Sequence, residues 1–170
     1  RAAGVPVDRL EAEFWQLVNG CGGEAGEFLR FVFRPDSETW QAFKIFPAAV
    51  AHHHAYLHGL LEHTLGVARS AKAVAQSYQG TAYEPDLDIV VAGALLHDLG
   101  KLDTYALDPG PESTLEGTVL DHIATGYARF VRLADEFKLT PLTRTLLAHI
   151  ILSHHGQKEF GSPVLPATPE

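Results

Sequence analysis

The sequence of 170 residues contains no methionine and a single cysteine, Cys21. One cysteine cannot form an internal disulfide, which is consistent with a reducing compartment, and we expect a cytoplasmic protein. No apolar run reaches the roughly 18 residues that a membrane-spanning helix needs, and we expect no membrane partner. The chain starts at Arg1 without the pattern of a secretory signal. It ends at Glu170 in a Pro-rich stretch, so we expect a fragment or a trimmed domain.

Basic residues are also scarce, because 13 Lys and Arg face 21 Asp and Glu and leave a net charge of −8. A groove that binds long nucleic acid over the protein surface needs an excess of positive charge, so the composition argues against one. It does not exclude a nucleotide in a small pocket, where bound cations reverse the local field. The hydrophobic content of 46% is typical of one globular domain with a sizeable core.

Strand signals are weak throughout, whereas apolar residues recur with the period of a helix, which predicts an all-α fold. Asp8 is a candidate cap for the first helix, and Thr118 begins a sequence that resembles a capping box. The segment 104–117 is polar and rich in Pro and Gly, as functional lids often are. The predicted helices cover about 8–20, 24–33, 37–46, 57–78, 86–97, 118–137 and 140–156.

The most informative feature is His97-Asp98, which follows an apolar segment in a chain with ten histidines. Burying an imidazole and a carboxylate costs several kcal/mol, roughly, unless a partner such as a divalent cation compensates. Adjacent side chains on a helix point about 100° apart, so His97 and Asp98 can face one ion only where the helix frays at its end. Gly100 is expected to produce such an end. Further histidines occur on separate predicted helices, and the set predicts a metal site between helices: His63, His122, His154 and His155.

Imidazole and carboxylate ligands suit Mn, Fe, Ni, Mg or Zn, and the absence of thiolates disfavours a structural zinc site. A bound ion lowers the pKa of water toward about 7 and generates a nucleophile. Asp98 and Lys101 are the candidate catalytic residues, with the Lys101 ammonium on a phosphoryl oxygen. Purely structural roles stay open for single residues. His97-Asp98 could be a hydrogen-bonded pair, Lys101 a helix C-terminal cation, and His149 a packed residue.

The sequence His97-Asp98-Leu-Gly-Lys101, preceded by His63, resembles the HD-domain superfamily of metal-dependent phosphohydrolases. The blocks at 53–64 and 151–163 are similar to those of the YhaM-type 3′–5′ exoribonuclease HD domain, and the resemblance runs from about 46 to 163. It implies a helical bundle with the metal site between helices. His63, His97 and Asp98 would hold the main ion, and His122, His154 and His155 a second ion bridged through Asp98. The implied substrate-binding residues are His54, Tyr56, Lys101, Glu159 and Ser162.

The resemblance also implies a domain organisation. We expect an N-terminal helical segment over 1–50, the HD core over 51–163 and a tail over 164–170 that stops before the last metal-ligand helix. Members of the family usually supply one more aspartate ligand from that helix, and the YhaM-type proteins carry an OB-fold domain for RNA. The expected function is hydrolysis of phosphoester bonds in RNA 3′ ends or nucleotides by metal-activated water. The alternatives are a hydrolase of small signalling nucleotides and a non-catalytic module that binds nucleotides or partners. The native metal and the oligomeric state stay open.

Overall fold

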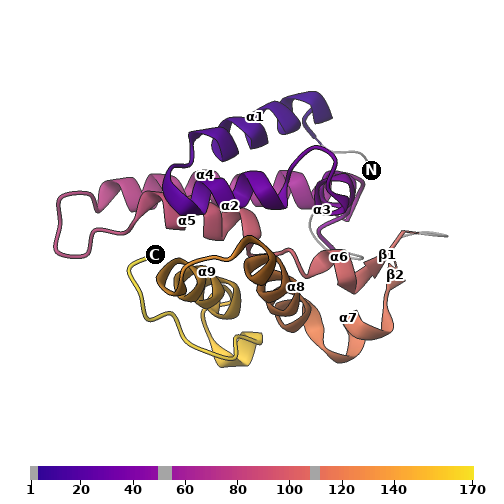
Figure 1. Ribbon diagram of the computed structural model, residues 1–170. Coiled ribbons are helices and arrows are strands. Elements are labelled where there is room, and N and C mark those ends of the chain that lie inside the picture. Colours follow the sequence, from indigo (N-terminus) through magenta and orange to yellow (C-terminus); the bar gives the residue numbers. More distant parts are fainter. Residues whose placement is uncertain (1–3, 50–54, 108–111) are drawn as a thin grey trace.

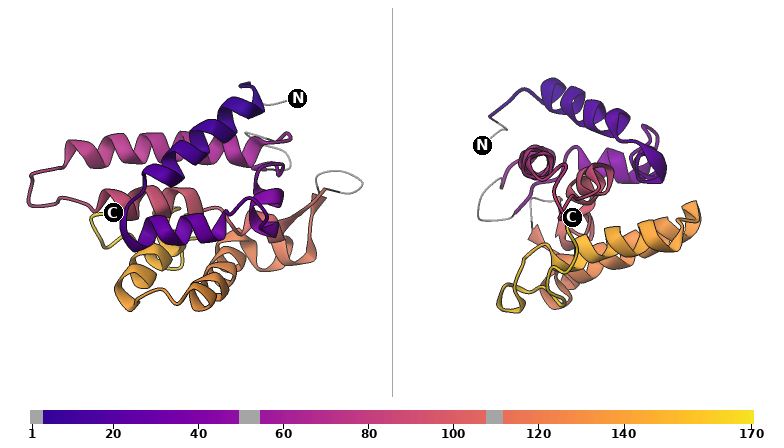
Figure 2. Two further views of the ribbon diagram at one scale, coloured as in Figure 1. Left: turned by 45° about the horizontal axis from the view of Figure 1, so that its top comes forward. Right: turned by 90° about the vertical axis from the view of Figure 1, so that its left-hand side faces the viewer.

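A computed structural model describes residues 4–49, 55–107 and 112–170. Helices α4 (Gly59–Ser77) and α5 (Leu87–Leu96) lie side by side at the centre of the molecule (Figure 1). Helix α1 (Val7–Gly20) packs against α4, and α2 (Gly23–Val32) packs against α5. Helices α8 (Asp121–Phe137) and α9 (Pro141–Ser153) lie on the opposite side of the pair, as the end-on view in Figure 2 shows. The central helices are therefore covered from two sides.

The remaining elements are short and connect these helices. They are α3 (Glu38–Phe43), α6 (Lys101–Thr104), α7 (Leu115–Val119), the 3₁₀ helix η1 (Lys158–Phe160), β1 (Tyr105–Ala106) and β2 (Glu112–Ser113). The two strands pair antiparallel, with Tyr105 opposite Ser113. They form a hairpin of two residues on each side within the segment that we expect to be a lid. The prediction of an all-α fold is confirmed, and the lid role stays a prediction.

Helix α5 is buried over its last eight residues, from Ile89 to Leu96. A helix that is apolar on all sides belongs in the middle of a protein, because every face must be covered. The Asp86 side chain accepts hydrogen bonds from the backbone N–H groups of Asp88 and Ile89 and fixes where the helix begins. The C-terminal end of α5, which precedes His97 and Asp98, therefore lies deep between the other helices.

The hydrophobic core is continuous from the N-terminal helices to α9. Phe14 stacks on Trp40 with ring centroids 4.8 Å apart, and Phe28 meets Phe130 edge-on at 5.8 Å. These contacts join α1 to α3 and α2 to α8. The domain boundaries proposed from the sequence stay predictions. Among the described residues, no helix combines the length and the hydropathy needed to cross a bilayer.

Two predicted helix starts are wrong. Asp8 lies inside the first turn of α1, which begins at Val7 after Pro6 and has no side-chain cap. Thr118 lies inside the short helix α7 and caps nothing; the cap of α7 is Thr114, whose hydroxyl accepts a hydrogen bond from the backbone N–H of Gly117. The chain then turns at Asp121, the first residue of α8, which has φ of 66°. Two helices therefore stand where the sequence predicts one, because the break depends on this left-handed turn.

Candidate metal centre

The end of α5 brings two adjacent polar side chains to one point. The helix ends at Leu96, and the following backbone turns tightly, because Leu99 N–H donates to Leu96 O and Lys101 N–H donates to Asp98 O. His97 Nε2 and Asp98 Oδ2 consequently lie 3.2 Å apart. This is the frayed helix end that the sequence requires for both residues to face one ion.

One group of candidate ligands consists of His63 from α4 with His97 and Asp98. His63 Nε2 lies 3.2 Å from Asp98 Oδ2 and 3.3 Å from His97 Nε2. His97 and Asp98 are 5% and 3% exposed, which leaves these polar groups almost without access to bulk water. The three residues offer ligand atoms that all lie within 4.8 Å of one another, a spacing that suits one metal ion.

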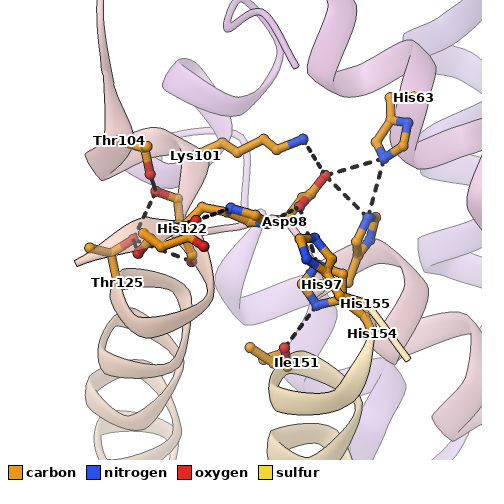
Figure 3. A network of polar contacts seen from close by, with 12 residues as sticks. His63, His97, Asp98, Lys101, Thr104, His122, Thr125, Ile151, His154 and His155 are labelled. Atoms are coloured by element: carbon orange, nitrogen blue, oxygen red, sulfur yellow. Dashed lines mark hydrogen bonds and ion pairs between the residues drawn. The ribbon is translucent and has the colours of Figure 1, made fainter. Parts of the chain in front are cut away.

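A second group consists of His122, His154 and His155, and two of these residues face the other oxygen of the same carboxylate. His122 comes from the first turn of α8, and the other two follow the last residue of α9. His122 Nε2 and His154 Nε2 lie 3.5 and 3.7 Å from Asp98 Oδ1. The three imidazoles again offer ligand atoms within 4.8 Å of one another. Figure 3 shows Asp98 between the two groups.

Hydrogen bonds at Nδ1 fix which ring nitrogen is free in these imidazoles. Carbonyl oxygens can only accept, so the Nδ1–H groups of three rings donate to them, as metal-ligating histidines commonly do. The pairs are His97 with Ala94 O, His154 with Ile151 O and His155 with Phe160 O. His122 Nδ1 meets the Asp121 carboxylate instead. In the neutral tautomers Nε2 then carries a lone pair, and in His122 and His154 that atom faces Asp98.

The centre therefore concentrates hydrogen-bond acceptors. Within the described residues, the buried Nε2 atoms of His122 and His154 have no hydrogen-bond donor. Buried polar atoms of this kind are rare, and each calls for a ligand, a proton or water. Lys101 supplies the one ammonium that contacts Asp98 among the described residues, with Nζ 2.8 Å from Oδ2. Lone pairs on nitrogen and oxygen that converge from two groups fit one or two divalent cations, and no thiolate is near them.

Burial and charge set the ionisation of the central pair. Burial alone would raise the pKa of Asp98, but the neighbouring His97, the hydrogen bonds from His63 and His97, and the Lys101 ammonium hold it well below its usual range. Burial lowers the pKa of His97, and the Asp98 charge outweighs this effect and raises it. Asp98 is consequently an anion at neutral pH, the form that binds metal.

Two histidines of the second group, His154 and His122, are held neutral by lowered pKa values. Burial lowers the pKa of His154 to about 4, and the charge of His97 adds to this effect. Burial also lowers the pKa of His122, against the attraction of Asp98 and Asp121 for its protonated form. Neutral imidazole is the metal-binding form, so no proton has to be displaced from either ring near pH 7.

A cavity of about 550 Å³ adjoins both groups. This volume falls within the range of small-molecule sites. His149 also lines the cavity, but its Nε2 accepts a hydrogen bond from the backbone N–H of Ala167, which agrees with its interpretation as a packed residue.

The predicted substrate-binding residues are more scattered. Lys101 lines the cavity. The Tyr56 hydroxyl donates a hydrogen bond to the Glu62 carboxylate. Burial, and to a smaller extent this hydrogen bond, raises the pKa of Tyr56 to about 12. Glu159 is exposed on η1, whereas Ser162 is 2% exposed. His54 lies outside the described residues. The binding roles of these residues stay predictions.

Sequence reasoning missed Asp121, which contacts His122 directly. Its signal was the Asp-His pair itself, the same pattern in reverse order as His97-Asp98. A carboxylate adjacent to a ligand histidine in sequence bonds to it only if the backbone turns back, and the pattern alone does not reveal this turn.

Comparisons with known proteins agree with this geometry. Residues 60–170 match the family model described as HD domain. The 3′–5′ exoribonuclease YhaM of Listeria monocytogenes (strain EGD-e) is 37% identical over 128 residues, and that of Bacillus subtilis (strain 168) is 36% identical over 128 residues. Each alignment covers 75% of this chain and 40% of the relative, so the aligned part spans less than half the length of these curated relatives. No solved structure matches the chain with significance.

Proposed function

The chain belongs to the HD domain family, and from this premise we propose that it hydrolyses phosphoester bonds in RNA 3′ ends or in nucleotides with a divalent metal ion. The observation that supports the proposal most strongly is the convergence of acceptor atoms on Asp98. Imidazole nitrogens approach its two oxygens from opposite groups, and two of these nitrogens are buried without a donor among the described residues. Such an arrangement is costly for a structural pair and suited to cations.

In this proposal, His63, His97 and Asp98 would hold one ion, and His122, His154 and His155 would hold a second. Asp98 lies between the two groups, with Oδ2 toward the first and Oδ1 toward the second, and would help to hold both ions. The native metal is Mn, Fe, Ni, Mg or Zn. When bound, such ions lower the pKa of water from about 15.7 toward about 7 and neutralise phosphate charge.

Lys101 is the proposed catalytic cation supplied by the chain itself. Its side chain is 13% exposed, and the ammonium contacts Asp98 Oδ2 at the wall of the cavity. A phosphate in the cavity would attract the same ammonium, which then stabilises charge that develops on the phosphoryl oxygens. Tyr56, Glu159, Ser162 and His54 are proposed to line the path of the substrate.

The name of the similar exoribonucleases favours RNA as the substrate, degraded from its 3′ end. Two properties of the chain favour the second candidate, a small or signalling nucleotide. The net charge of −8 repels a long polyanion, and the cavity of about 550 Å³ is of a size for one small ligand. If the RNA reading holds, we propose that an OB-fold domain assists RNA binding, which the negative charge of this chain opposes. A cytoplasmic location, compatible with the free thiol of Cys21, belongs to the same proposal.

The test is a hydrolysis assay with Mn²⁺ on single-stranded RNA labelled at its 5′ end, beside a panel of mononucleotides and signalling nucleotides. A ladder of products shortened from the 3′ end supports the exoribonuclease, and turnover of nucleotides alone supports the second candidate. Hydrolysis of neither, in a protein that contains no bound metal, would leave only a non-catalytic binding module.

A further inference from the structure

Among the four imidazoles of the centre whose Nδ1 contacts are described, His122 alone meets a charged side chain. The Nδ1 atoms of His97, His154 and His155 donate to backbone carbonyls, whereas His122 Nδ1 lies 2.5 Å from Asp121 Oδ1. A carbonyl accepts a neutral hydrogen bond, but a carboxylate accepts one with about twice the strength. The orientation of His122 is therefore held by a different and stronger interaction than that of the other rings.

The backbone is specially shaped to make this contact. Asp121, the first residue of α8, has φ of 66° and follows the end of α7 by two residues. Non-glycine residues rarely adopt this conformation, and its cost is of the order of 1 kcal/mol. The turn places the side chain of Asp121 over the residue that follows it, so that one oxygen accepts from both the backbone N–H and Nδ1–H of His122.

The surroundings of Asp121 keep the carboxylate close to the ring. A Cβ at Gly161 would lie 3.6 Å from Asp121 Oδ2 and 3.8 Å from His155 Nδ1, so the Gly161 turn passes close to both residues. Asp121 itself is 55% exposed, but His122 is only 14% exposed, and its buried Nε2 points toward Asp98. The interaction thus connects a half-exposed carboxylate to an atom inside the centre.

We propose that Asp121 is a positioning residue that holds His122 in the Nδ1–H tautomer and aims its Nε2 at the second metal ion. The metal part of this inference rests on the proposed function. The assignment of the tautomer rests only on the contact between Asp121 and His122. A carboxylate behind a ligand imidazole raises its basicity and fixes its orientation, and loss of such a partner weakens metal binding 10–100-fold, roughly.

The test compares Asp121→Gly, Asp121→Asn and a control, Lys138→Gly. Glycine accepts the positive φ at either position, so both glycine variants relieve a left-handed non-glycine residue at one end of α8. Lys138 has φ of 64° and caps the far end of the helix, away from the centre. Asparagine keeps an acceptor oxygen at 121 but removes the charge.

Two readouts are measured. In metal-free protein near pH 8, ¹⁵N NMR shifts of the His122 ring report its tautomer. In Mn²⁺ titrations, the affinity of the second site is measured. This site is identified as the one that no longer binds Mn²⁺ in His122→Ala. We expect the Nδ1–H tautomer in the wild type and in Lys138→Gly, and a mixture of tautomers in Asp121→Gly. Mn²⁺ affinity should fall roughly 10–100-fold in Asp121→Gly. It should fall less in Asp121→Asn and stay unchanged in Lys138→Gly.

An unchanged tautomer in Asp121→Gly would overturn the inference, as would unchanged Mn²⁺ affinity in that variant. Failure of the proposed function has a different signature. If the wild type binds no Mn²⁺, the metal role is wrong, but the NMR readout still decides whether Asp121 fixes the ring of His122.

Discussion

Gly100 is the contact point between the metal-binding end of α5 and helix α8. Its carbonyl accepts a hydrogen bond from Thr125 Oγ1, and a Cβ at this position would lie only 1.9 Å from the carbonyl oxygen of His122. It would also lie 2.4 Å from the backbone N of Gly126. These are backbone atoms of a helix, which cannot rotate away. The prediction is that Gly100→Ala forces α8 away from the centre.

The size of the effect follows from this geometry. Ordinary contact for a Cβ begins at about 3.4 Å, so the His122 carbonyl must retreat by about 1.5 Å, which is 3.4 less 1.9. Overpacking of this kind costs about 1–3 kcal/mol, and the lost bond from Thr125 adds about 1 kcal/mol. The total of about 2–4 kcal/mol corresponds to a fall in Tm of roughly 4–16 °C for a chain of this length. His122 Nε2, now 3.5 Å from Asp98 Oδ1, would move with α8.

The assay combines thermal unfolding with Mn²⁺ binding, and Gly66→Ala is the matched control. Gly66 lies inside α4, where a Cβ would meet no atom within 4 Å. Alanine should stabilise that helix by about 0.5–1 kcal/mol. We expect Gly100→Ala to unfold earlier and to bind Mn²⁺ more weakly, and Gly66→Ala to do neither. A Gly100→Ala protein as stable as the wild type would refute the close approach of α8.

Two further predictions concern charge. Lys101→Met removes the ammonium but keeps a side chain of similar length. The rate of hydrolysis should fall by a factor of about 10²–10³ while the Mn²⁺ content is preserved. Undiminished turnover would contradict the role of Lys101. The pKa of His154 is about 4 in the folded protein, against an ordinary value of 6.5 that applies in the unfolded chain. Below pH 6.5 the unfolded chain therefore binds a proton at His154, whereas the metal-free native state binds it only near pH 4. The free energy of unfolding should therefore fall by up to about 3 kcal/mol as the pH drops across this window. Urea unfolding in the presence of EDTA should show a weaker dependence of stability on pH in His154→Gln than in the wild type. The same pH dependence in both proteins would refute a neutral, buried His154.

Helices with a strong apolar pattern could be predicted from the sequence. The expected helix over 57–78 corresponds to α4, Gly59–Ser77, and the helix before His97 ends at Leu96. Periodicity works here because each helix buries one stripe or, for α5, every face. The break between α7 and α8 could not be predicted in the same way, because the apolar pattern continues across it. It depends on the positive φ of Asp121, which a non-glycine residue rarely adopts.

The meeting of the histidines could be anticipated only in part. The His97-Asp98 pair at a helix end, together with histidines on separate helices, predicts a centre, because polar groups near an apolar run need partners. The division into two groups around the two oxygens of Asp98 is expected only from the family resemblance. Which ring nitrogen faces inward depends on carbonyls such as those of Ala94 and Ile151, which every residue possesses and no sequence pattern marks.

The central claim is that Asp98 and the surrounding imidazoles hold divalent cations that hydrolysis requires. Elemental analysis of the purified protein and of Asp98→Ala, beside the hydrolysis of RNA and nucleotides, tests it most directly. We predict one or two divalent ions per chain in the wild type, and fewer ions with no hydrolysis in the variant. Full activity of Asp98→Ala, or a wild type that hydrolyses its substrate with no divalent ion bound or added, would contradict the account.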